Sequence, residues 1–150
     1  MKLSTKGRYG LRALIDLALY SENETVSIQS IARRQNISDS YLEQLMRKLR
    51  SAGLIVSVRG AQGGYKLARP ANEISVGDVL RALEGSLEAV TCGGEDNSCQ
   101  GADLCVTKFV WERINSSIRD TVDSIKLSQL VEEIRLMREK GQIQVQKCDN

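Results

Sequence analysis

The sequence predicts a mainly α-helical fold with one small β hairpin, and three observations support this. Apolar residues recur at helical spacing through most of the 150-residue chain. A β-branched run at 54–58 is followed by a glycine-rich turn and a second short strand at 65–68. A long apolar stripe then runs through 105–125. Together these features predict a winged helix-turn-helix plus a long dimerisation helix.

Two short helices joined by a tight turn are expected after a first helix at about 5–20. The earlier of the two covers about 28–35 and is capped by Ser27. Asn36 tolerates the left-handed conformation that ends a helix. The later one covers about 40–52. Two helices in this arrangement are typical of a DNA-binding helix-turn-helix.

The later of these helices carries polar side chains on a face beside its apolar stripe. In the major groove, Gln suits adenine, Glu accepts from cytosine, and Arg suits guanine or phosphate. Ser40 and Glu43 also have the spacing of a capping box, in which Glu43 would only close the start of the helix. Both roles stay open for Glu43. The candidate DNA-contacting residues on this helix are Ser40, Tyr41, Glu43, Gln44 and Arg47.

The hairpin follows directly after this helix, which is the position of the wing in winged-helix proteins. Arg59 and Gln62 lie in its turn, where glycine lets the backbone approach a phosphate or the minor groove. A glycine-rich cradle for a nucleotide is the alternative, but that cradle leads from a strand into a helix. Here the turn leads into a second strand, so a DNA-binding wing is favoured.

The charge of the chain is unevenly distributed. Residues 1–70 carry 12 Lys and Arg against 5 Asp and Glu, net +7, whereas residues 71–150 carry 9 against 14, net −5. A basic front half favours double-stranded DNA as its partner, although a chance imbalance on solvated faces is the alternative. No apolar run is long enough for a membrane span, and the start lacks a signal-peptide pattern. A cytoplasmic protein without a membrane partner is therefore expected.

Three of the four cysteines lie within fifteen residues, in the pattern C-x6-C-x5-C with glycines between them. In the reducing cytosol, clustered thiolates more often hold a metal or an iron–sulfur cluster than form disulfides. Structural zinc is less favoured, because its cysteine pairs are usually closer in sequence. The candidate ligands are Cys92, Cys99 and Cys105.

The sequence after this loop predicts helices that pair two chains. The stripe at 105–125 has little left in the chain to cover it, so burial against a second copy is expected. The alternative is burial against the first helix of the same chain. A final helix is expected at about 127–140. Three parts are therefore predicted: a DNA-binding domain at 1–90, a cysteine loop at 91–105, and dimerisation helix, final helix and tail at 106–150.

Four motifs in this order resemble the IscR-type iron–sulfur regulators of the bacterial winged-helix Rrf family. They are the opening 3–10, the recognition helix 38–45, the wing 58–65 and the cysteine loop. The resemblance covers roughly residues 1–140. It implies a DNA-binding homodimer whose three cysteines hold a cluster, most simply [2Fe–2S], with [4Fe–4S] as the alternative. It also implies DNA contacts at Ser40, Tyr41, Glu43, Gln44, Arg59 and Gly60.

One position departs from the family pattern. Lys108 stands where IscR-type members usually have a histidine ligand, and the chain contains no histidine. A lysine ligates only when deprotonated, which is unfavourable near neutral pH. The fourth ligand is left open between a partner residue, a small molecule and several residues of this chain. The candidates in this chain are Cys148, Glu95, Asp96 and Asp103.

The sequence therefore favours a transcriptional regulator that senses cluster status or redox or nitric-oxide stress. The alternatives are a cluster-free or zinc-binding regulator, and an iron–sulfur carrier or assembly factor. An enzyme with a small-molecule substrate is not expected, because there is no histidine base and no evident pairing of a nucleophile with a base.

Overall fold

The structure is a computed structural model that describes residues 3–91 and 104–141. Two of the predicted cluster ligands, Cys92 and Cys99, lie outside the described residues. So do Cys148, Glu95, Asp96 and Asp103. In the described part, the elements in chain order are α1 (Thr5–Tyr20), α2 (Ile28–Gln35), α3 (Asp39–Ser51), β1 (Ile55–Val58), β2 (Gly64–Leu67), the 3-10 helix η1 (Ala71–Glu73), α4 (Val76–Glu84), α5 (Val106–Ser124) and α6 (Leu127–Glu139).

The predicted helix-turn-helix is present. Ser27 caps α2 through a bond from the Ser30 amide, and Asn36 ends this helix with a left-handed φ of 53°. The capping role that the sequence left open for Ser40 and Glu43 is wrong, since Ser38 is the N-cap of α3 and accepts from the Tyr41 amide at 3.3 Å. Glu43 therefore lies exposed inside the helix and is free of a capping role.

The competition between two serines explains this error. Ser38 and Ser40 both suit an N-cap, and only the second is followed three residues later by a glutamate. Starting the helix after Ser38 places Asp39 in the first turn, where a carboxylate is favoured by the helix dipole. The apolar stripe of Leu42, Leu45, Met46 and Leu49 is buried on the inner face of this helix.

The wing is a two-stranded antiparallel hairpin. Its register runs from Ile55 opposite Leu67 to Val58 opposite Gly64. Val26, in the segment between α1 and α2, extends this sheet through two backbone bonds with Tyr65. In the turn, the Gly63 amide donates to the Gly60 carbonyl at 2.9 Å, and a Cβ at Gly63 would lie 2.4 Å from the Val58 carbonyl oxygen. The hairpin therefore requires glycine at this position.

One hydrophobic core holds α1 to α4 and the base of the wing together. Its fully enclosed side chains include Leu14, Leu17, Ile31, Leu42 and Ile74. Leu127 and Val131 of α6 belong to the same core, because α6 turns back onto α1 and η1 after α5. The core of the module predicted at 1–90 thus includes a helix from the part predicted at 106–150.

Glu84, at the end of α4, closes the start of α1. One of its carboxylate oxygens accepts from the Ser4 amide, the Ser4 hydroxyl and the Gly7 amide at 2.9, 2.6 and 2.9 Å. These amides belong to the first turn of α1, where helix donors have no partner inside the helix. The hydrogen bond from the Ser4 hydroxyl is the main cause that lowers the pKa of Glu84 from its ordinary value of 4.5.

Replacing Glu84 with alanine is expected to lower the free energy of unfolding by about 2 kcal/mol at pH 7. The folded pKa lies below the unfolded one, so the carboxylate stabilises the fold above pH 4.5, and this contribution is lost as the pH falls below that value. Urea unfolding of wild type and variant at several pH values measures it. The control is Glu133→Ala, which removes an exposed carboxylate from α6. An equal gap between wild type and Glu84→Ala at pH 7 and pH 3 contradicts the proposed role of the charge.

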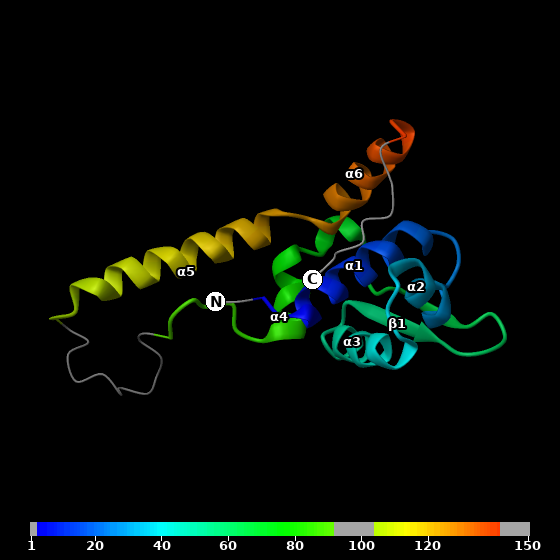
Figure 1. Cartoon of the computed structure of the whole chain (residues 1–150), viewed down its shortest axis with the longest axis horizontal. Coiled ribbons are helices and arrows are strands. Elements are labelled where there is room, and N and C mark those ends of the chain that lie inside the picture. Colours follow the sequence, from blue (N-terminus) through cyan, green and yellow to red (C-terminus); the bar gives the residue numbers. More distant parts are fainter. Residues whose placement is uncertain (1–2, 92–103, 142–150) are drawn as a thin grey trace.

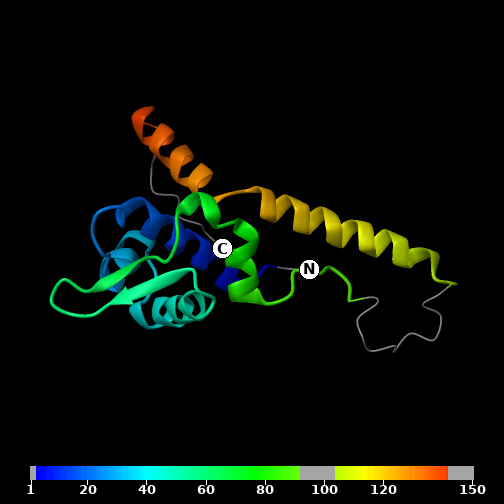
Figure 2. The same ribbon diagram turned by 180° about the vertical axis from the view of Figure 1, so that it is seen from behind.

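The long helix α5 projects from the rest of the chain as an arm (Figure 1; Figure 2 shows it from behind). None of its 19 residues is buried, and among the helices its main contacts are with α4. The expected alternative, burial of the stripe against the first helix, is therefore wrong. The exposed apolar side chains at and before its first turns are Leu104, Val106, Phe109, Val110 and Ile114.

The far end of α5 is fixed to the core. The Val76 amide donates to the Ile125 carbonyl, and the Leu127 amide donates to the Ile74 carbonyl, each at 2.9 Å. The guanidinium of Arg81 on α4 pairs with Asp123 near the end of α5. The arm therefore has one anchored end and one projecting end. Within 3–91 and 104–141, no helix has the length and hydrophobicity of a membrane span.

Candidate nucleic-acid interface and cysteine loop

The polar face of α3 presents the predicted base-reading side chains to solvent. Glu43, Gln44 and Arg47 are exposed, while the opposite face is buried in the core. Ser40, in the first turn, is exposed as well. The rigid core thus holds a row of donors and acceptors with the chemistry that reads base edges in the major groove.

Tyr41 differs from its neighbours because it contacts α1. Its hydroxyl lies 3.3 Å from the Thr5 hydroxyl oxygen. Its ring meets the Tyr9 ring edge to face, with centroids 6.2 Å apart and an angle of 87° between the planes. The half-buried ring therefore fixes the start of α3 against the start of α1, whatever its hydroxyl does on DNA. Sequence patterns did not indicate this pairing, because it joins residues far apart in the chain.

The tip of the wing carries its predicted residues in a fixed turn. Arg59, Gly60 and Gln62 are all exposed. Gly60 has a φ of 114°, a conformation that side chains rarely adopt. The Thr25 hydroxyl donates to the Gln62 carbonyl at 2.6 Å, which holds the turn against the segment between α1 and α2.

The recognition helix and the wing lie close together on one part of the molecule (Figure 1). Arg50 near the end of α3 lies within 3.4 Å of the Ser57 hydroxyl on β1. The projecting end of α5 extends away from them. The structure therefore brings the residues predicted on α3 and on the wing to one region, and it places Cys105, at the start of α5, away from them.

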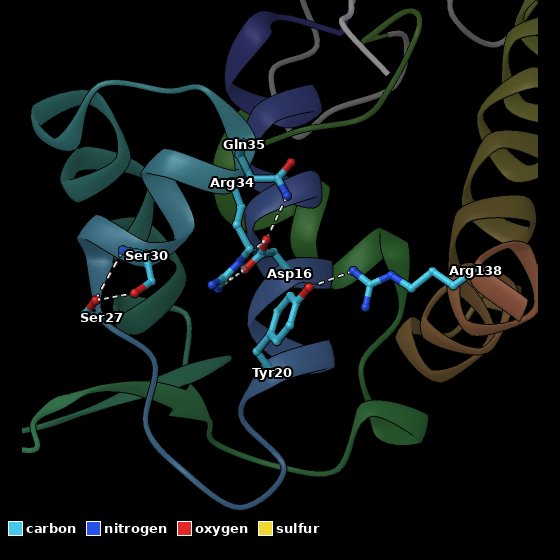
Figure 3. A network of polar contacts seen from close by, with 7 residues as sticks. All are labelled: Asp16, Tyr20, Ser27, Ser30, Arg34, Gln35 and Arg138. Carbon is cyan, nitrogen blue, oxygen red and sulfur yellow. Dashed lines mark hydrogen bonds and ion pairs between the residues drawn. The ribbon is translucent and has the colours of Figure 1, made fainter. Parts of the chain in front are cut away.

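A buried ion pair holds α2 on α1 (Figure 3). The Asp16 side chain is 3% exposed, and its two oxygens accept from Arg34 Nε at 3.0 Å and Nη2 at 2.6 Å. Gln35 Nε2 adds a third donor at 2.8 Å. The hydrogen bond to Asp16 is the main cause that raises the pKa of Arg34 above its usual value.

The same network reaches α6 through an aromatic ring. The Arg34 guanidinium lies 4.1 Å from the centroid of the Tyr20 ring, and the Arg138 guanidinium lies 5.4 Å from it. Arg138 also donates to the Tyr20 hydroxyl at 2.7 Å (Figure 3). Cation–π contacts of this kind hold the Tyr20 ring in place beside the two guanidinium groups. The helix that follows the arm is thereby tied to the first helix of the helix-turn-helix.

Among the three predicted cluster ligands, the structure places Cys105. It is exposed at the N-cap position of α5, and its sulfur lies 3.0 Å from the Thr107 hydroxyl. That hydrogen bond is the main cause that lowers the pKa of the Cys105 thiol, with the Lys108 amide as a further cause. A thiol at a helix start, with a lowered pKa, has the chemistry of a thiolate ligand.

Lys108 stands where IscR-type members usually have a histidine ligand, and in this structure it pairs with Glu112. Its ammonium group lies 3.8 Å from a carboxylate oxygen of Glu112, one helical turn further along α5. Both side chains of this pair are exposed, 39% for Lys108 and 59% for Glu112, so it is a weak surface ion pair. Within the described residues, no three Cys, Asp or Glu side chains are grouped closely enough to hold a metal ion.

Known transcriptional regulators resemble this chain over most of its length. The chain matches the Rrf2 family, described as iron-dependent transcriptional regulator, over residues 3–133. It is 47% identical to the HTH-type transcriptional regulator IscR of Pectobacterium atrosepticum over 131 residues, which are 87% of this chain and 79% of that protein.

Two solved structures share the fold. The T. potens IscR structure has a TM-score of 0.73 and 45% identity, covering 96% of this chain and 93% of that one. The structure of CymR, the global cysteine regulator of B. subtilis, also has a TM-score of 0.73, with 39% identity over 89% of this chain and 98% of that one. None of these relatives is named as an enzyme. The chain therefore belongs to the Rrf2 family and is a winged-helix transcriptional regulator of the IscR type.

Proposed function

We propose that the chain acts as a homodimer that binds double-stranded DNA and changes its DNA affinity with the state of an iron–sulfur cluster. The observation that carries the proposal is the joint exposure of the α3 polar face and the wing tip on one rigid core. The cluster would be held by Cys92, Cys99 and Cys105. The division into a DNA-binding part, a cysteine loop and a dimerisation part follows from these roles.

On DNA, α3 enters the major groove and the wing follows the backbone or the minor groove. Gln44 has the groups for a bidentate contact with adenine, and Glu43 accepts from cytosine. Arg47 and Arg59 supply positive charge for guanine or phosphate. Ser40 and Gln62 add hydrogen-bonding groups, and the exposed backbone of Gly60 permits close approach.

Gln44→Ala and Arg59→Ala are expected to weaken DNA binding in different ways. Gln44→Ala removes a base contact, so the difference in binding free energy between palindromic and scrambled DNA falls by about 1–3 kcal/mol. Arg59→Ala removes a charge, so affinity falls on both DNAs and the salt dependence becomes shallower by about one unit. Band-shift titrations at several salt concentrations measure both, and each variant is the control for the other. Wild-type binding that is equal on palindromic and scrambled DNA would contradict sequence-specific recognition.

The dimer is proposed from the exposed stripe of α5. Phe109 is 67% exposed and Val110 is 46% exposed, with further apolar side chains on either side. Two copies of this helix can cover each other across a twofold axis, and each copy would carry one reading head to a half-site. Sedimentation at micromolar concentration is expected to give twice the 16.6 kDa of one chain. A mass of one chain would contradict the dimer.

The residues present fit a cluster in part. Cys105 is exposed and the pKa of its thiol is lowered by the hydrogen bond with Thr107, and cysteine thiolates are the usual ligands of iron–sulfur clusters. The proposed cluster is [2Fe–2S], with [4Fe–4S] as the alternative. When bound, such a cluster supplies redox and iron-dependent chemistry. The ion pair of Lys108 with Glu112 supports a fourth ligand other than this lysine.

The contacts of the arm support a route from the cluster to DNA. Arg81 joins α4 to Asp123 of α5, and Lys48 of α3 donates to the Leu83 carbonyl of α4 at 3.3 Å. A change in how α5 sits on α4 would therefore shift the support of the recognition helix. Coupling between two sites in a protein typically amounts to about 1–3 kcal/mol.

A cluster-free or zinc-binding regulator is the second candidate, and the lysine at position 108, where IscR-type members usually have a histidine, favours it. The visible spectrum of anaerobically purified protein, with iron and acid-labile sulfide counted per chain, separates the two. A coloured protein with about two of each per chain supports [2Fe–2S]. A protein that stays colourless after reconstitution contradicts the cluster and supports the second candidate. An iron–sulfur carrier gains no support from relatives that are named as regulators.

A further inference from the structure

Asn115, on the arm, binds the chain that leads into the cysteine loop. Its side-chain oxygen accepts from the Ala89 amide at 2.8 Å, and its side-chain nitrogen donates to the Val90 carbonyl at 2.9 Å. Both side-chain groups of one asparagine are thus engaged by two consecutive backbone units. The side chain is half-buried, and it lies 25 residues away from Val90 in sequence.

These two bonds fix a segment that has no regular structure of its own. Residues 86–91 follow the end of α4 and form neither helix nor strand. In the described part of the chain, the Asn115 bonds are the hydrogen bonds that join this segment to a helix. Without them, the path from α4 to the cysteine loop would depend on weaker contacts.

The two bonds from Asn115 to Ala89 and Val90, called the Asn115 clamp below, lie close in the chain to two of the proposed ligands. Cys92 follows Val90 by two residues, and two residues of chain span at most about 7 Å. Cys105 lies at the N-cap of α5, the helix that carries Asn115. A single rigid helix therefore holds the chain just before the first cysteine of the loop and also carries the last one.

A role in holding up the core does not account for Asn115. None of the residues of α5 is buried, so the side chain supports no packed interior. Asparagine is a weaker helix former than alanine, so its presence inside the helix does not favour the helix itself. What the side chain provides is a pair of bonds to a separate segment.

We propose that Asn115 is a positioning residue for the cluster, because it sets the start of the cysteine loop against the helix that bears Cys105. The inference rests on the proposed function, since it assumes that these cysteines hold a cluster. Supporting residues outside the ligand set commonly change metal affinity by about 10-fold to 100-fold. The clamp is therefore expected to govern how long the cluster is retained.

Asn115→Ala tests this inference, and Ser117→Ala is its matched control. Ser117 is an exposed polar residue two positions away, whose hydroxyl bonds to the Arg113 carbonyl of its own helix at 2.8 Å. After anaerobic reconstitution, the bleaching of the visible absorption by an iron chelator is followed over time. Asn115→Ala is expected to lose its cluster about 10-fold to 100-fold faster than wild type, and the control at the wild-type rate.

Amide hydrogen exchange in the cluster-free protein gives a second readout that does not depend on iron. The Ala89 amide is expected to be protected in wild type and in Asn115→Asp, which keeps the accepting oxygen, and to exchange faster in Asn115→Ala. Asn115→Asp loses the donor to Val90, so its cluster is expected to bleach faster than in wild type. Unchanged Ala89 exchange in Asn115→Ala overturns the clamp.

The failure of this inference is distinguishable from the failure of the proposed function. If wild type takes up a cluster and Asn115→Ala retains it as long as wild type does, the inference alone is overturned. If wild type takes up no cluster, the proposed function and the inference are both overturned. Thermal melting of each variant shows whether faster bleaching comes from the loop or from a loss of the whole fold. If the variants that bleach faster also melt at a lower temperature, in the same order, the positioning role is overturned.

Discussion

Replacing Asp16 with alanine is expected to lower the free energy of unfolding by about 3–5 kcal/mol. The Asp16 carboxylate is buried and accepts from Arg34 and Gln35, so the change leaves two donors of α2 without their partner. Losing Asp16 costs more than the pair contributes, because the Arg34 guanidinium, which is only 33% exposed, and the Gln35 amide then lack their acceptor. Urea unfolding at neutral pH, followed by circular dichroism, measures the change.

The matched control is Glu22→Ala. Glu22 pairs with Arg135 of α6, so it also joins the first part of the chain to the last helix, but its side chain is 61% exposed. An exposed pair is expected to contribute less than about 1 kcal/mol. Equal unfolding midpoints for wild type and Asp16→Ala would contradict the structural role assigned to the network in Figure 3. The variant is also expected to lose DNA binding, because α2 supports the recognition helix.

Replacing Cys105 with serine is expected to abolish stable cluster binding. Serine keeps the size of the side chain but lacks the thiolate that iron prefers. The loss of a direct ligand is expected to exceed the roughly 100-fold effect of supporting residues. The measurement is the iron and sulfide content and the visible spectrum after anaerobic reconstitution.

The fold of Cys105→Ser is expected to stay intact, because Cys105 is an exposed N-cap residue and serine is a favourable N-cap. The thermal melting curve of the cluster-free variant is the control, and it is expected to match that of the cluster-free wild type. A variant with the full wild-type cluster content would remove Cys105 from the ligand set. The same experiment on Cys148→Ser tests one candidate for the fourth ligand.

Local patterns predicted most of the fold, because they act through near neighbours in sequence. The helix that ends at the left-handed Asn36 is present as the sequence indicates. The expected start of α3 at about residue 40 lies within one residue of the observed Asp39, but the N-cap is Ser38 and not Ser40. The apolar stripe at 105–125 was recognised, and within the described residues its first part, with Val110 and Ile114, is exposed.

The contacts that hold the site in place could not be predicted in the same way. Glu84 reaches Ser4 across 80 residues, and Arg34 reaches Asp16 across 18. In the sequence, Glu84, Arg34 and Asp16 each look like an ordinary solvated charge at a helix surface. Their partners become neighbours only when the helices pack, so no periodicity indicates them. One weak signal existed for Asp16, which lies between the apolar Ile15 and Leu17.

The candidate site was predictable in its chemistry but less so in its geometry. The exposed residues of α3 and of the wing follow from their places on a helix face and in a glycine turn. The contact of Tyr41 with Tyr9 and the clamp of Asn115 depend on tertiary packing. The cysteines follow from spacing, and Cys105 alone among the three lies in the described part.

The central claim is that the cluster changes DNA binding. Its most direct test is an anaerobic band-shift titration of one preparation, measured with its cluster and again after the cluster is removed, on the same palindromic DNA and at one salt concentration. The two affinities are expected to differ by about 5-fold to 150-fold. Equal affinities of the two forms would contradict the central claim and would leave a DNA-binding regulator whose cysteines do not govern its binding.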